Sequence, residues 1–168
     1  MNASRAGAVL AVAAVLLLAG CGQGPDAGGS RGDEATGAPV PFEVLDETSN
    51  SGRDAGAEHL VVALTGDDFV ALWTEHVSPR VPAPPAPSVD FAVSTVVGVF
   101  DDSVGPLALT GVTEEGDEII VHIDKTDTSA CPRVQVVEHN AVVARIEVPA
   151  DPGTTFTVAR TVTAADCP

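Results

Sequence analysis

The stretch Leu107-Ala-Leu-Thr-Gly-Val-Thr113, Glu114-Glu-Gly-Asp117, Glu118-Ile-Ile-Val-His-Ile-Asp124 decides the fold class of this chain. Two runs rich in apolar residues flank a short acidic turn. In the second run, the apolar side chains at every second position are Ile119, Val121 and Ile123. A period of two is typical of a β-strand that buries one face. We therefore predict two strands separated by a turn.

Similar runs lie on both sides of this stretch. The other predicted strands cover residues 42–45, 59–64, 95–100, 134–137, 141–148 and 154–162. His139-Asn140 is expected to form a turn between two of them. Regular short strands with turn signals between them predict a mainly β domain, either an antiparallel β-sandwich or a partly closed barrel.

One segment has the helical period instead. Phe69, Leu72, Trp73, His76 and Val77 fall at i, i+3, i+4, i+7 and i+8, so they form one stripe along a helix. Thr65 is the predicted N-cap, with Asp68 placed to reach back to it. Ser78-Pro79 should end the helix. We predict one amphipathic helix, followed by an extended proline-rich connector over residues 80–88.

The N-terminal segment resembles a secretory signal. Arg5 precedes an apolar run from Ala6 to Leu18, and Leu18-Ala-Gly-Cys21 follows the pattern of a bacterial lipobox. The resemblance implies a signal peptide over residues 1–20 and acylation of Cys21, which would anchor the chain to the outer face of the bacterial cell membrane. The alternatives are an ordinary signal peptide or an uncleaved anchor helix. The apolar run is shorter than the roughly 20 residues that cross a bilayer comfortably.

Composition divides the rest of the chain. Residues 21–40 combine the lipidated Cys21 with a Gly/Ala-rich segment that has little apolar bulk, so we expect a flexible linker. Residues 41–168 are long enough for one domain with a real core. The chain has 8 Lys and Arg against 24 Asp and Glu, a net charge of -16. That charge argues against nucleic-acid binding and against a polybasic membrane surface.

Three cysteines fit this division. With Cys21 lipidated, Cys131 and Cys167 remain, and we expect them to form a disulfide in an oxidising compartment. A bridge of this span would stabilise the fold by roughly 3–4 kcal/mol. Two free thiols or a metal pair are the alternatives, but the chain has no Cys-x-x-Cys spacing.

Catalytic motifs are missing from the sequence. There is no His-Glu-x-x-His, no Gly-x-Ser-x-Gly, no phosphate-binding loop and no Gly-x-Gly-x-x-Gly after a strand. The histidines, none of which has an obvious nucleophile or a second histidine beside it in the sequence, are His59, His76, His122 and His139. His122 and Asp124 share a strand face and are the pair closest to a catalytic arrangement. We predict no enzyme activity, cofactor or metal site, and leave open weak calcium binding at acidic turns such as Asp101-Asp102.

The order of several short motifs resembles the C-terminal domain of the PrcB-type protease complex subunits. These motifs are Leu72-Trp73, then 87–91 (Pro-Ser-Val-Asp-Phe), then 96–100 (Val-Val-Gly-Val-Phe), and later Cys131 followed by Val148-Pro149. Those relatives usually have a Gly-Gly-Tyr turn where this chain has residues 105–109, and this chain has no Tyr. The resemblance implies a surface-attached, non-catalytic accessory domain of a protease complex.

The expected function is therefore that of a cell-surface lipoprotein with a non-catalytic protein-interaction domain, as an accessory subunit of a surface protease complex. Two alternatives remain. One is a surface hydrolase whose catalytic residues are scattered along the sequence. The other is a lipoprotein that binds a small ligand in a pocket between the helix and the sheet.

Overall fold

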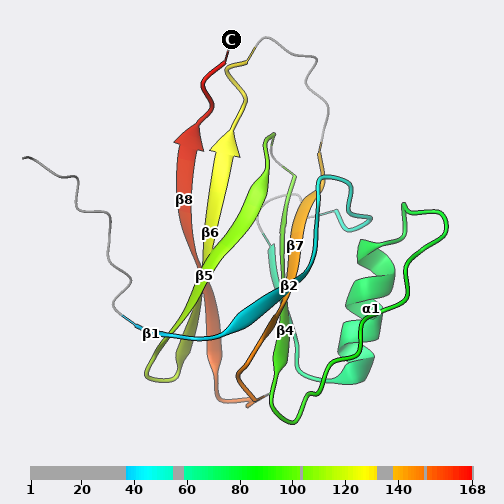
Figure 1. The fold of residues 1–168 in the computed structure, drawn as a ribbon, viewed down its shortest axis with the longest axis vertical. Helices are drawn as coiled ribbons and strands as arrows, with labels where there is room; N and C mark the ends of the chain where they lie inside the picture. The colour runs from blue at the N-terminus through cyan, green and yellow to red at the C-terminus, as the bar shows by residue number, and fades with distance from the viewer. Residues whose placement is uncertain (1–36, 55–58, 103, 132–137, 150, 168) are drawn as a thin grey trace, which may run out of the picture. The chain divides into compact units, whose positions relative to one another are not determined.

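The computed structural model describes residues 37–54, 59–102, 104–131, 138–149 and 151–167, all within one compact unit, Glu34–Pro168 (Figure 1). Its strands are β1 (Ala38–Pro39), β2 (Phe42–Thr48), β3 (His59–Ala63), β4 (Thr95–Asp101), β5 (Leu107–Glu115), β6 (Glu118–Asp127), β7 (Asn140–Ile146) and β8 (Thr155–Ala164). The helix is α1 (Gly66–His76). None of the helical structure in these residues is long and apolar enough to cross a membrane.

The strands form two four-stranded sheets, with the orders β1-β5-β6-β8 and β2-β7-β4-β3. All named strand pairs are antiparallel except β6 and β8, which run parallel. The described strands do not close into a barrel, so the predicted mainly β fold with one helix is confirmed, in its sandwich form. The helix lies against the β2-β7-β4-β3 sheet, on the side away from the other sheet (Figure 1).

The core between the two sheets follows from the alternation in the sequence. Ile119, Val121 and Ile123 of β6 are at most 1% exposed, as predicted, and they pack in one cluster with the inner residues of β4 and β7. The turn between β5 and β6 has Gly116 at φ +63°, a left-handed conformation that glycine adopts at little cost.

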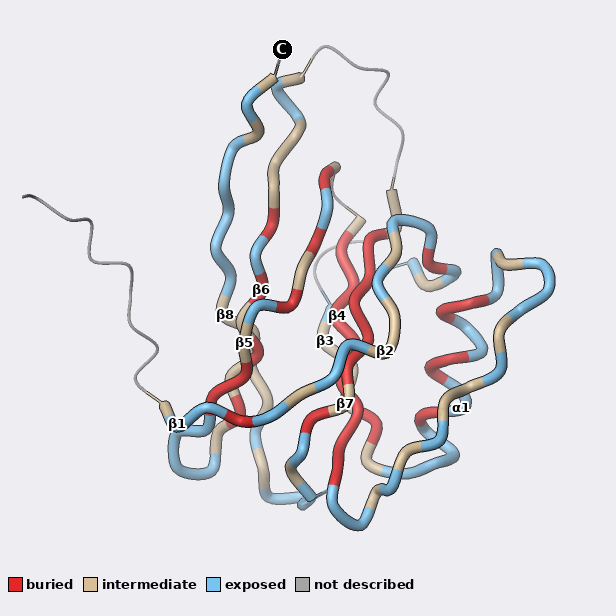
Figure 2. Tube along the Cα trace, in the orientation of Figure 1, coloured by how far each residue is buried: buried red, intermediate tan, exposed pale blue. Residues whose placement is uncertain are grey.

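A second core lies between α1 and the adjacent sheet. Phe69, Leu72 and Trp73 are buried there against residues such as Phe100 and Val143. Because β4 and β7 are covered on both faces, they are almost entirely buried (Figure 2). Burying an apolar side chain stabilises the fold by about 1.5–3 kcal/mol. Because both faces of β4 are covered, residues 95–100 form a continuous run rich in β-branched residues, without alternating apolar and polar positions.

The ends of α1 follow the sequence prediction. The Asp68 backbone N–H donates to Thr65 Oγ1 at 3.2 Å, and the Thr65 hydroxyl donates to Asp68 Oδ2 at 2.7 Å. Trp73 Nε1 donates to the Pro84 carbonyl at 3.0 Å, which fastens the proline-rich connector against the helix.

Other boundaries differ from the prediction. Asn140 begins β7 and His139 forms an isolated bridge with Asn50, so His139-Asn140 is not a turn. The expected flexible linker is also too long, because β1 pairs with β5 and Val40 is only 8% exposed. The signal peptide, Cys21, most of the linker and the predicted strand 134–137 lie outside the described residues.

Candidate functional site

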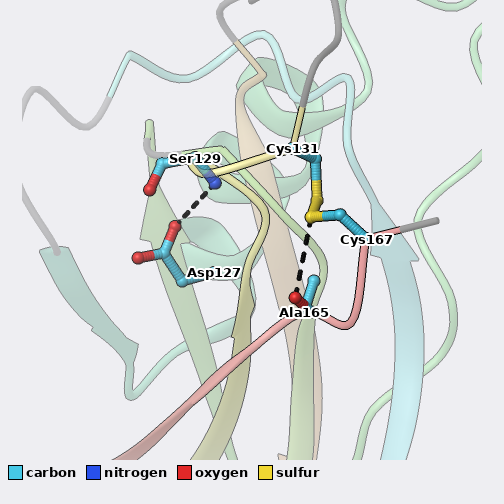
Figure 3. Close-up of a disulfide and its surroundings, with 5 residues drawn as sticks. All are labelled: Asp127, Ser129, Cys131, Ala165 and Cys167. Carbon is cyan, nitrogen blue, oxygen red and sulfur yellow. Dashed lines mark hydrogen bonds between the residues drawn. A yellow bond between two sulfur atoms is a disulfide. The ribbon is translucent and has the colours of Figure 1, made fainter.

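The structure joins Cys131 and Cys167 in a disulfide, with their Cα atoms 5.3 Å apart (Figure 3). The parallel pairing of β6 and β8 ends at Asp127 and Ala164, and each cysteine lies a few residues beyond its strand. The bond therefore ties the ends of two neighbouring strands. Cys167 Sγ also lies 3.6 Å from the Ala165 carbonyl oxygen, a contact in which a disulfide sulfur has no proton to donate.

A buried polar network lies where α1 ends. His76, with no exposed surface, has its Nε2 2.7 Å from Asp46 Oδ2 and its Nδ1 3.0 Å from Ser51 Oγ. Arg80 binds the same carboxylate with both terminal nitrogens, one of them at 2.9 Å. The residues come from β2, from the loop after it, from the C-terminal end of the helix and from the turn that follows the helix.

A bulge in β2 places Asp46 in this network. The register with β7 shifts between Val44 and Asp46, so Asp46 lies opposite Val143. Because Val143 belongs to the core on the helix side, the Asp46 side chain points toward the helix as well. An extra residue in one strand re-aims the side chains that follow it, and here it directs a carboxylate at His76.

Charge states in the network follow from burial and contacts. Burial lowers the pKa of His76 below its usual 6.5, and the hydrogen bond to Asp46 offsets only part of that effect. Burial by itself would raise the pKa of Asp46, but the hydrogen bonds from Arg80 and His76 outweigh it and hold the pKa below 3.8. A neutral imidazole between a carboxylate and a hydroxyl satisfies both of its ring nitrogens.

The three residues Ser51, His76 and Asp46 form the type of array that activates a serine nucleophile. The sequence showed no nucleophile near any histidine along the chain, and the fold brings Ser51 to His76 from a distant position. Ser51 is 2% exposed, so its hydroxyl is closed to a substrate in this conformation. Ser51 and His76 are 25 positions apart, and no local pattern indicated that they meet.

The other histidines lie in different surroundings. His122 is on the outer face of β6, where its Nε2 lies 2.8 Å from Thr113 Oγ1; in the described part of the chain it makes no hydrogen bond to Asp124. His59 is exposed at the start of β3. His139 Nδ1 lies 2.9 Å from Asp102 Oδ1.

Asp54, Asp102 and His139 are the set in the described residues that could hold a metal ion. Each offers one ligand atom, and these atoms all lie within 4.8 Å of one another. Asp54 is exposed and the other two are half-buried. The neighbouring Asp101 faces the opposite way and joins the two sheets, because its carboxylate binds Lys125 at 3.1 Å and Arg160 at 2.7 Å.

Surface clefts lie at two places among the residues that the structure describes. One of about 500 Å³ lies where β2 ends and β5 and β7 begin, and is lined by Glu47, Thr48, Ser49, Pro106, Leu107, Glu138 and Asn140. The other, of about 270 Å³, lies between α1 and β3, where the ligand-binding alternative places a pocket. Its lining includes Arg53, Asp68 and Glu75 beside apolar residues.

Comparison of the chain with protein-family models, with curated proteins and with solved structures found no match.

Proposed function

We propose that this chain is a lipoprotein, anchored through acylated Cys21 to the outer face of the bacterial cell membrane, whose β-sandwich domain binds another protein without catalysis. The observation that carries the proposal is Leu18-Ala-Gly-Cys21 at the end of the apolar run that starts at Ala6. The Cys131–Cys167 disulfide supports it, because such bonds persist in oxidising compartments outside the cytoplasm.

The exposed edge of β8 supports protein binding. β8 is the last strand of its sheet, and its C-terminal half, Arg160–Ala164, is exposed. Its one charged side chain, Arg160, is bound to Asp101, so no free charge blocks the approach of a partner strand. An edge of this kind accepts an extended segment of another protein by strand addition. The resemblance to PrcB-type subunits favours a surface protease as that partner.

A hydrolase is the second candidate, favoured by the Ser51-His76-Asp46 array. Its weakness is access, since both Ser51 and His76 are buried. The array has a sufficient structural role, which is to satisfy polar groups where the loop after β2 meets the helix.

The anchor is tested by comparing the wild type with Cys21→Ala in cells fed with radiolabelled fatty acid. The wild type should carry the label and fractionate with membranes, and Cys21→Ala should do neither. A labelled Cys21→Ala protein, or an unlabelled wild type, would contradict the proposal.

The partner is tested with a photo-crosslinking amino acid placed at Thr163 on β8 of the membrane-anchored protein. Val70, which is 54% exposed on the helix, is the matched control position. We expect one recurring product at Thr163, identified by mass spectrometry as a surface protease, and none at Val70. Equal products at both positions, or none at Thr163, would argue against binding at this edge.

A further inference from the structure

The register of β4 and β7 brings Asp102 and His139 together. The last pair in the ladder is Asp101 and Asn140, so Asp102 and His139 occupy the next antiparallel position. Phe100 and Ala141, two residues back on each strand, belong to the core on the helix side. Because side chains alternate along a strand, Asp102 and His139 project toward that same side. Their 2.9 Å contact follows from this geometry.

The loop after β2 brings Asp54 to the same place. Asn50 forms a bridge with His139, and the Ser51 backbone N–H donates to the His139 carbonyl at 2.9 Å. The next residue, Gly52, donates to the His76 carbonyl at 3.0 Å, and a Cβ there would lie 2.4 Å from the Glu75 carbonyl oxygen. The loop is therefore held closely between β7 and the end of α1. The path of this loop places Asp54 beside the pair formed by Asp102 and His139.

We propose that Asp54, Asp102 and His139 bind a divalent transition-metal ion, with Zn²⁺ as the best match. One imidazole nitrogen and two carboxylate oxygens are ligands that zinc accepts, whereas calcium prefers an all-oxygen set. Zinc bonds of about 2.0–2.2 Å place ligand atoms roughly 3.3 Å apart in a tetrahedron. His139 Nδ1 and Asp102 Oδ1 lie 2.9 Å apart, close to that spacing, and the ligand atom that Asp54 offers lies within 4.8 Å of theirs.

Charge favours a cation at these residues. The set contains two carboxylates, on a chain whose net charge is -16. The nearby Arg53 is directed elsewhere, with its guanidinium paired to Glu75 and lying 5.4 Å above the Phe100 ring. Three protein ligands leave one tetrahedral position for water or for a group on a binding partner. The proposal does not depend on the lipid anchor or on the protein partner.

Calorimetric titration of the chelator-treated full-length protein with Zn²⁺, and separately with Mn²⁺ and Ca²⁺, tests the site. The titration is run in a Cys21→Ser background, so that no thiol outside the disulfide can bind metal. We expect one Zn²⁺ per chain, with Ca²⁺ binding more weakly. Asp54→Asn, Asp102→Asn and His139→Gln should each weaken Zn²⁺ binding by about tenfold or more, since loss of even an outer-shell partner typically costs 10–100-fold.

His122→Ala is the matched control, because it removes a histidine from the other sheet and should leave the affinity unchanged. Asp54→Asn changes an exposed side chain, so it tests the site even if the two half-buried variants fail to fold. Zn²⁺ should also raise the thermal midpoint of the wild type, and chelator should reverse the rise. The proposal is overturned if no saturable binding occurs, if Asp54→Asn binds Zn²⁺ like the wild type, or if Ca²⁺ binds more tightly than Zn²⁺.

Discussion

His76 and Asp46 are 30 positions apart in the sequence and lie 2.7 Å apart, from Nε2 to Oδ2, in the space between α1 and its sheet. The contact connects the end of the helix to β2, with Ser51 on the other side of the ring and Arg80 on the carboxylate. Protonation of His76 makes the stability of the domain depend on pH.

Stability should fall as the pH drops from about 7 to about 5. Because the pKa of His76 is lowered in the fold, the unfolded chain binds a proton first as the pH passes below 6.5. The lowered pKa of Asp46 also makes stability fall with falling pH, at pH values near and below 3.8. Urea denaturation across this range should show a shallower pH dependence for His76→Gln than for the wild type. An equal slope in both proteins would rule out His76 as the source.

Ser51→Ala should destabilise the domain by about 1–2 kcal/mol, because it leaves a buried ring nitrogen of His76 without its hydrogen bond. Urea denaturation measures the change, and Ser49→Ala, on the nearby surface, is the control. A serine-directed fluorophosphonate should not label Ser51 in the folded wild type. Labelling at Ser51 that His76→Gln abolishes would instead favour the hydrolase.

Loss of the disulfide should lower the free energy of unfolding by about 2–4 kcal/mol. We expect Cys131→Ser, Cys167→Ser and the double variant to be destabilised to a similar extent, since each removes the same bond. Hydrogen exchange should rise mainly at the C-terminal end of β8. Alkylation of the wild type without reductant, followed by mass spectrometry, should find no free thiol at either position.

Gly105→Ala should be more damaging than Gly116→Ala, although both residues have positive φ. A Cβ at Gly105 would lie 1.8 Å from the Thr126 carbonyl oxygen, whereas one at Gly116 would have no atom within 4 Å. We expect Gly116→Ala to lower the free energy of unfolding by about 1 kcal/mol, from backbone conformation alone, and Gly105→Ala to lower it by more than about 2 kcal/mol. Thermal or urea denaturation separates the two, and equal losses would contradict the steric argument.

Local patterns in the sequence predicted the elements well. The alternation of Ile119, Val121 and Ile123 identified the inner face of β6, and the spacing of Thr65 and Asp68 identified the start of the helix. Both signals lie within a few residues, where backbone geometry fixes which side chains share a face.

Long-range relations could not be read from the sequence in the same way. The bulge that turns Asp46 toward His76 depends on pairing with β7, a partner that local periodicity does not name. The grouping of Asp54, Asp102 and His139 likewise needs the register of β4 and β7 and the path of the loop after β2. No local pattern in the sequence therefore indicates that these three residues meet.

The parallel pairing of β6 with β8 has a consequence for the order in which the domain folds. β7, which belongs to the other sheet, comes between these two strands in the sequence, so the pair cannot form as a local hairpin. Such non-local pairing raises contact order and slows folding. If the chain emerges from the membrane N-terminus first, β6 has an unpaired edge until Thr155–Ala164 has crossed. That interval is when the protein is most open to aggregation or to capture by a chaperone.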